Sequence, residues 1–142
     1  MKPLIKSAAF LFLLLLVSTL GCKKDKSANE LIIGKWEVKT MKLVYYENNV
    51  KTSESTQLFG SKEMELEIRN DGTGSEYENL AENEVFTWSM NGSSVTVRES
   101  GMDDVVMTVT VTENNLTLVS VETELYEGTT YKYETTITAN RE

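Results

Sequence analysis

The chain has no histidine, a single cysteine (Cys22) and a single proline (Pro3) among its 142 residues. Without histidine it lacks the commonest general base and a common metal ligand. One cysteine cannot form an intrachain disulfide. No glycine-rich phosphate loop precedes a helical pattern. We therefore expect no enzymatic activity, and so no catalytic residues, and no metal site or cofactor.

Basic residues are also scarce. The chain has 14 lysines and arginines against 22 aspartates and glutamates, which gives a formal net charge of −8. Such a balance disfavours binding to nucleic acids and to anionic surfaces. We expect no nucleic-acid partner.

Long apolar runs are absent except for one near the N-terminus. Ala8–Val17 is a run of ten apolar residues, and it follows the basic residues Lys2 and Lys6. A transmembrane helix needs about 20 apolar residues, whereas a basic start before a short apolar run is typical of a secretory signal peptide. We expect residues 1–21 to be a helical signal peptide that is removed.

The residues at the predicted cleavage site, Gly21 and Cys22, resemble the lipobox of bacterial lipoproteins. The resemblance implies that Cys22 becomes the first residue and carries a diacylglyceryl group and an acyl chain such as palmitate. More than one acyl chain gives stable membrane anchoring. Polar residues 22–29 would then be a lipidated tether, and the membrane would be a partner through the lipid on Cys22. The expected location is the bacterial cell envelope, lipid-anchored at the outer membrane on either face. A free cysteine beside an ordinary signal peptide, or an uncleaved anchor, are the alternatives.

Residues 30–142 read as one all-β domain. Apolar and polar residues alternate in segments such as Lys62–Arg69, and turn residues such as Asp71-Gly72 and Asn91-Gly92 separate the segments. This pattern is typical of antiparallel strands joined by hairpins. We predict an up-and-down meander of about eight strands closed into a barrel, because closure removes exposed sheet edges.

Four details of the pattern matter below. Glu30–Ile33 reads as a helical turn or as the start of a strand, and Val50–Leu58 as a poor edge strand or a mobile loop. The alternation of the first long strand changes phase near Thr40–Lys42, which predicts a β-bulge or a strong bend. Most carboxylates, among them Glu63, Glu65 and Glu67, are expected on solvated outer faces and in turns.

Short motifs suggest a family. Gly34-Lys35-Trp36 begins the first strand, Arg141 ends the last one, and Asp71–Gly74 and Trp88–Gly92 occupy two hairpins. Together they resemble the lipocalins, and in particular the small lipocalin-like lipoproteins of Gram-negative bacteria. The resemblance covers residues 31–141. It implies that Gly34, Trp36 and Arg141 close one end of the barrel, with the arginine packed on the indole.

An eight-stranded barrel is either filled by its own side chains or holds one small ligand. We favour a small hydrophobic or amphipathic ligand. The alternative is a non-enzymatic envelope interaction module that binds a protein or glycan, or inhibits an enzyme, through loops on a filled barrel. The candidate ligand-lining residues are Phe86, Trp88, Met90, Met107, Val109, Tyr131 and Tyr133.

Overall fold

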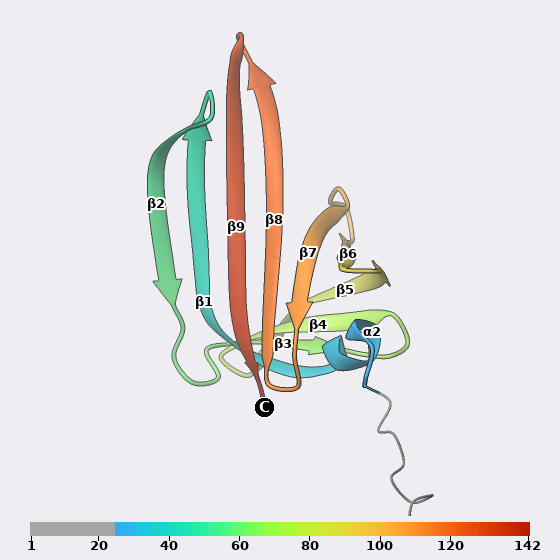
Figure 1. Cartoon of the computed structure of the whole chain (residues 1–142). Coiled ribbons are helices and arrows are strands. Elements are labelled where there is room, and N and C mark those ends of the chain that lie inside the picture. The colour runs from blue at the N-terminus through green and yellow to red at the C-terminus, as the bar shows by residue number, and fades with distance from the viewer. Residues whose placement is uncertain (1–24) are drawn as a thin grey trace, which may run out of the picture.

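The computed structural model describes residues 25–142. The predicted signal peptide, Cys22 and the first part of the tether therefore lie outside the described residues. The described chain begins with one short helix and continues as β-strands (Figure 1). The elements are α2 (Ala28–Ile32), β1 (Gly34–Glu47), β2 (Val50–Leu58), β3 (Met64–Ile68), β4 (Thr73–Glu78), β5 (Ala81–Asn91), β6 (Ser94–Glu99), β7 (Val105–Val111), β8 (Asn115–Tyr126) and β9 (Thr129–Arg141).

Helix α2 is a single capped turn. The backbone N–H of Ser27 donates to the Glu30 carboxylate at 2.8 Å, and the Ser27 hydroxyl accepts from the Glu30 N–H at 3.4 Å. This reciprocal pair is a capping box, which starts a helix by satisfying its free N–H groups. The segment before β1 is therefore helical, and its last residue, Ile32, is fully buried. In the part of the chain that is described, no helix has the length and apolar character needed to cross a membrane.

Eight of the nine strands close into an antiparallel barrel, which confirms the predicted fold class. The first four residues of β1, 34–37, pair with β3, and the strand from Trp36 onward pairs with β9. A bulge between Val38 and Thr40 interrupts the β1–β9 register, close to the predicted position. Beyond the bulge β1 leaves β3 and pairs with β2 instead. The barrel is therefore not a simple meander, because β2 lies outside its closed circuit.

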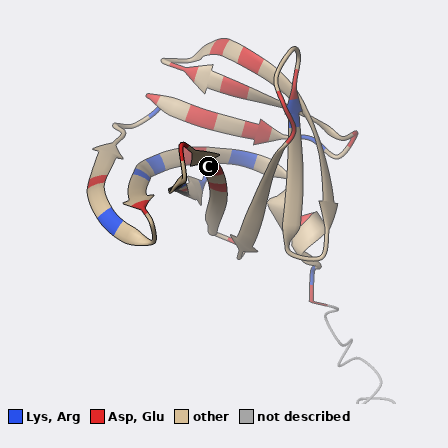
Figure 2. Ribbon diagram, turned by 90° about the horizontal axis from the view of Figure 1, so that it is seen from above, with Lys and Arg blue, Asp and Glu red and all other residues tan. Residues whose placement is uncertain are grey.

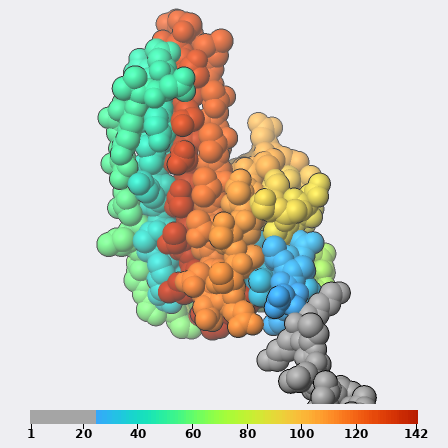
Figure 3. All heavy atoms as spheres, viewed as in Figure 1, coloured from blue at the N-terminus to red at the C-terminus, as the bar shows by residue number. Residues whose placement is uncertain are grey.

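One side of the barrel is much taller than the other. We call this part the wall: β2, residues 40–47 of β1, residues 120–126 of β8 and residues 129–136 of β9. These strands run side by side in the order β2-β1-β9-β8. Strand β7 stops pairing with β8 at Ser120, so β8 continues above it paired only with β9. Figures 1 and 3 show the wall standing above the shorter strands.

Strand β2 settles the choice between a strand and a loop at Val50–Leu58. It pairs with β1 over its whole length, and all nine of its residues are exposed. It is an edge strand of the wall.

The core fills the lower barrel, beside α2. Its largest fully buried side chains are Trp36, Ile32 and Leu116. Gly74 allows Phe86 on the neighbouring strand to enter this core, because a Cβ at position 74 would lie 2.2 Å from the Phe86 ring. The strand alternation therefore places the core correctly, but close packing also requires a glycine at this point.

The acidic row on β3 is not simply solvated, contrary to the sequence-based expectation. Glu65 is 8% exposed. A hydrogen bond with the Glu142 carboxyl, together with burial, raises the pKa of Glu65. Glu67 accepts hydrogen bonds from Arg69 and Tyr77, which lower its pKa. The outer face of β3 is covered by the C-terminus and by Tyr77, and alternation within one strand does not reveal such cover.

Candidate ligand-binding site

The lower end of the barrel is closed by the Gly34-x-Trp36 motif and Arg141. The guanidinium of Arg141 lies 4.2 Å from the centroid of the Trp36 ring, so the expected contact is present. Trp36 is fully buried, and its indole N–H donates to the Ile32 carbonyl at 2.7 Å. Arg141 also donates to the carbonyls of Ile33, Leu31 and Glu113. At this end, the Trp36 ring and the Arg141 guanidinium thus find their interaction partners within the chain.

Gly34 is required for this closure. Its φ of +142° is a conformation that residues with side chains rarely adopt. A Cβ at this position would also lie 2.4 Å from Nη1 of Arg141. The glycine therefore lets the arginine reach the carbonyls of the α2 turn.

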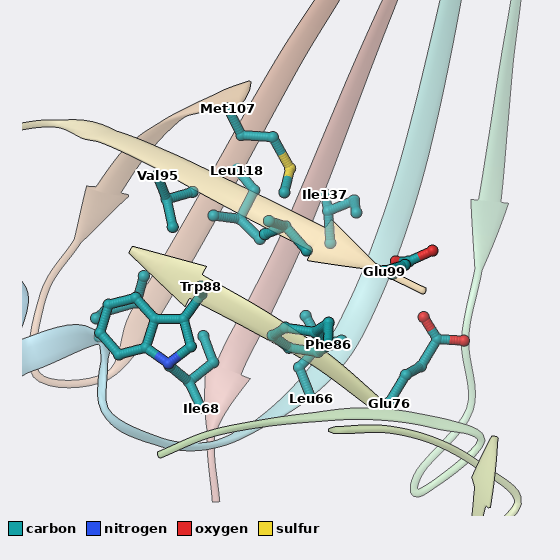
Figure 4. A pocket seen from close by; sticks show the side chains of 12 residues that line it. Leu66, Ile68, Glu76, Phe86, Trp88, Val95, Glu99, Met107, Leu118 and Ile137 are labelled. Carbon is teal, nitrogen blue, oxygen red and sulfur yellow. The ribbon is translucent and has the colours of Figure 1, made fainter. Parts of the chain in front are cut away.

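The upper part of the barrel encloses a cavity of about 130 Å³. Ile68 reaches it from below, and Leu118 and Ile137 line it on the wall side (Figure 4). Ile32 of α2 also lines the cavity, and the other lining residues lie on β3 to β7. The apolar lining residues are Ile32, Leu66, Ile68, Phe86, Trp88, Val95, Val97, Met107, Leu118 and Ile137. Two acidic residues, Glu76 and Glu99, complete the lining. The barrel is thus neither fully packed nor widely open.

The seven residues expected to line a ligand site fall into three groups. Phe86, Trp88 and Met107 line the cavity. Val109 and Met90 are also expected there, but neither lines the cavity. Val109 is buried in the core, and Met90 packs against the core and faces a shallow outer groove near Asn29. Alternation identifies the side chains that point into the barrel, but it does not show whether they lie in the packed core or beside the cavity.

The remaining two candidates, Tyr131 and Tyr133, lie on the wall above the cavity. They are on the same side of β9 as Ile137, because side chains two residues apart share a face. Tyr133 is directly paired with Tyr45 of β1, and their ring centroids are 5.1 Å apart. Tyr45 also stacks on Tyr131 at 6.0 Å. The inner face of the wall therefore continues the cavity lining upward as an aromatic surface.

Three glutamates form the rim of the cavity opposite the wall; we call them the acidic rim. Glu76 and Glu84 are a directly opposed pair on β4 and β5, and Glu99 follows on β6, where it is opposite Phe86. Figure 4 shows Glu76 and Glu99 at one end of the cavity, away from the Trp88 indole. Burial first, and then the charges of Glu84 and Glu76, raise the pKa of Glu99.

No cation within residues 25–142 neutralises the acidic rim, since none of its three carboxylates forms an ion pair with a lysine or arginine there. Among the same residues, no group of three or more acidic or thiol side chains is arranged to hold a metal ion. The rim is therefore a concentration of negative charge beside an apolar cavity.

The wall separates its charges by face. Its lysines, Lys42, Lys51 and Lys132, lie on the outer face, where each contacts a glutamate of that face. On the inner face, Glu122 is opposite Tyr133, and Glu124 is opposite Tyr131. Figure 2 shows how acidic residues recur along several strands of the molecule.

The inward carboxylates correct the expectation that glutamates point outward. Val95, Val97 and Glu99 continue one alternation along β6, and Phe86 and Glu84 continue another along β5. An inward row thus changes from apolar to acidic at the point where it reaches the barrel mouth. This change from apolar to acidic residues is the sequence signal for the rim. It can be interpreted only when the position of the barrel mouth is known.

The comparisons with known proteins agree with this architecture. The model of the lipocalin-like domain family matches residues 32–118. The chain belongs to the lipocalin-like domain family. The match begins at the buried Ile32 of α2 and ends at Leu118 in the cavity lining. No curated protein and no solved structure matched the chain. The lipocalin-like barrel is in general a scaffold for small-ligand binding, and the cavity is the place in this chain where that would occur.

Proposed function

We propose that this lipocalin-like protein is a lipid-anchored, non-enzymatic binding protein of the bacterial cell envelope, with a small amphipathic ligand in its upper cavity. The observation that carries the proposal is the cavity itself. Apolar side chains from six strands and helix α2 line it, while its acidic rim and the inner face of the wall provide polar groups next to it. Concave apolar sites with a few polar groups are the usual form of small-molecule sites.

The size of the cavity limits what it can enclose. A dry apolar cavity of about 150 Å³ is enough to bind benzene. The cavity here, at about 130 Å³, would hold one ring or a short alkyl segment. Any larger ligand would continue along the inner face of the wall, past Ser120 and Thr135, to the tyrosines.

The envelope location rests on the N-terminal sequence. A basic start, a ten-residue apolar run and Gly21-Cys22 support export followed by acylation of Cys22. Mass spectrometry of the mature protein tests this directly. The expected mass is that of residues 22–142 plus a diacylglyceryl group and an acyl chain. Cys22→Ser should move the protein from the membrane fraction to the soluble fraction, and an unchanged distribution would contradict the anchor.

Ligand binding can be tested by filling the cavity. Val97 lines the cavity, whereas Val106 is 56% exposed. The protein purified from its own host should carry a small molecule in native mass spectrometry. Val97→Phe should remove it, and the matched surface variant Val106→Phe should keep it. A ligand-free wild-type protein would count against the proposal, as would a ligand retained by a folded Val97→Phe variant.

A second candidate function is an interaction module, and the observation that favours it is the free edge of β2. This strand pairs with β1 on one side only, and its residues are all exposed. An unpaired edge can accept a strand from a partner protein. Replacement of Thr52 and Thr56 by proline would block such pairing. If envelope proteins captured by the wild type were unchanged by this double substitution, the β2 edge would have no role in their capture.

A further inference from the structure

Within residues 25–142, the cavity and the inner face of the wall form one concave surface without a lysine or arginine. Along β8, the inward residues run from Leu118 in the cavity through Ser120 to Glu122 and Glu124. Along β1, they run from Met41 through Leu43 and Tyr45 to Glu47. Directly opposed residues share a face of an antiparallel sheet, so these carboxylates lie beside the tyrosines.

The charge pattern is not that of a plain acidic surface. On the outer face of the wall, Glu54 contacts Lys42 at 3.2 Å, and Lys132 lies 3.7 Å from the centroid of the Tyr46 ring. On the inner face, within the described residues, neither Glu122 nor Glu124 has such a partner. The same sheet therefore balances its charge on one side and leaves it unbalanced on the side that faces the cavity.

The acidic rim repeats this imbalance on the opposite side of the cavity. Glu99 lines an apolar space, and burial together with two neighbouring carboxylates already raises its pKa. Placing a carboxylate beside apolar surface and next to other carboxylates is unfavourable for the empty protein. A cation in the mouth of the cavity would relieve this repulsion.

The tyrosines offer a second kind of cation contact. Aromatic faces attract ammonium and guanidinium groups that lie within about 6 Å of the ring centroid. The chain uses this contact at its closed end, where Arg141 covers Trp36 at 4.2 Å. The cluster of Tyr45, Tyr131 and Tyr133 has aromatic faces and nearby carboxylates but no lysine or arginine in contact with it among residues 25–142.

We propose that the ligand of this cavity is an organic cation: a small apolar group that enters between Phe86 and Ile137, joined to an ammonium group held in the mouth of the cavity, between the acidic rim and the tyrosines of the wall. This inference rests on the proposed ligand-binding function and narrows the ligand to one chemical class. An anionic amphipath, such as a fatty acid, would meet Glu76 and Glu99 at the rim and Glu122 on the wall. A neutral amphipath could donate a hydrogen bond to one of these carboxylates, but it would leave their charge unbalanced.

Isothermal titration calorimetry with three matched probes tests the inference. The probes are 2-phenylethylammonium, 2-phenylethanol and 3-phenylpropanoate, which share a ring of the size that the cavity holds. The full-length protein is used in lipid nanodiscs, and empty nanodiscs provide the reference for partitioning into lipid. We expect the ammonium to bind at least tenfold more tightly than the alcohol, and the carboxylate to bind most weakly, because a charge-assisted hydrogen bond adds roughly a factor of ten.

Two charge-removing variants locate the effect. Glu99→Gln should lower the affinity for 2-phenylethylammonium about tenfold and leave that for 2-phenylethanol unchanged. The matched control is Glu113→Gln, which removes one negative charge from an exposed side chain beside Arg141, at the closed end. It should change neither affinity. A loss of ammonium binding that is equal in both variants would show that net charge alone is responsible, and would overturn the inference.

The remaining outcomes separate this inference from the proposed function. Equal binding of the ammonium and the alcohol, or preference for the carboxylate, would overturn the cation inference and leave a ligand-binding cavity. If none of the three probes binds and the host-purified protein carries no small molecule, both proposals fail.

Discussion

The two ends of this barrel use the same chemical groups in opposite ways. At the closed end, Trp36 is buried, Arg141 covers its ring, and three backbone carbonyls accept from the guanidinium. At the open end, aromatic rings and carboxylates gather on one concave surface without a cation from residues 25–142. The aromatic and charged groups of the closed end are paired with each other, whereas those of the open end are available to interact with a ligand. We infer that the closed end contributes most to stability and that the open end is where the proposed ligand would be recognised.

The largest expected effect is on stability, at the closed end. Trp36→Ala should lower the free energy of unfolding by about 3–5 kcal/mol, because it leaves a cavity and removes the arginine stack. Trp88→Ala should cost clearly less, because Trp88 is only partly buried and borders a space that already exists. Urea denaturation of both variants measures the contrast. Equal losses of unfolding free energy in the two variants would contradict the claim that the closed end contributes more to stability than the open end.

A conservative change at Arg141 gives the next effect. Arg141→Lys should lower the free energy of unfolding by about 1–2 kcal/mol, since an ammonium group replaces neither the stacked plane nor the forked donors of the guanidinium. Arg98→Lys is the matched control, because Arg98 pairs with Asp104 at the surface. We expect the control to change stability by less than about 0.5 kcal/mol. A loss of the same size in the control would show that the stack of Arg141 on Trp36 contributes no more to the free energy of unfolding than a surface ion pair does.

At the open end, removing an aromatic face should affect binding more than stability. Tyr133→Leu should weaken binding of 2-phenylethylammonium by about two- to fivefold, the range for a cation–π contact at a partly exposed site. Tyr46→Leu changes the outer face of the same wall, where Tyr46 contacts Lys132. Titration calorimetry should show no change for this control. If both variants bind the probe as the wild type does, the wall takes no part in recognition.

The smallest effect is a gain in stability. The raised pKa of Glu99 means that folding favours its neutral form, so its ionised form destabilises the protein at neutral pH. Glu99→Gln should therefore raise the melting temperature by about 2 °C at pH 7. The gain should shrink as the pH falls through the pKa of Glu99, because the wild-type carboxyl is then neutral as well. Scanning calorimetry at several pH values checks this, and a lower melting temperature at pH 7 would contradict it.

Much of the fold can be predicted from local signals. Alternation and turn residues predict most strand positions, the phase change in β1 predicts its bulge, and Gly34 and Trp36 mark the strand that begins at the closed end. Tyr131 and Tyr133 can be assigned to the inward face of β9 for the same reason. The covering of Glu65 by Glu142 depends on the distant C-terminus, which no local pattern shows.

The site could be predicted less well, because it depends on lengths that differ between strands. Strand β7 ends its pairing at Ser120, whereas β8 and β9 continue, and this difference turns inward residues into an open wall. The rim exists because β4, β5 and β6 bring Glu76, Glu84 and Glu99 to one level. The sequence contains each glutamate, but the level at which they meet is a property of the closed barrel.

The most direct test of the central claim is methyl NMR of the full-length protein in lipid nanodiscs during titration with 2-phenylethylammonium. The open end is reported by Val97, Leu118 and Ile137, which line the cavity, and the closed end by Val38, which is fully buried near Trp36. If the ligand binds at the open end, the cavity methyl groups should shift progressively while the Val38 signal stays fixed. Shifts centred on Val38, or no shift of the cavity methyl groups at saturating probe, would contradict it.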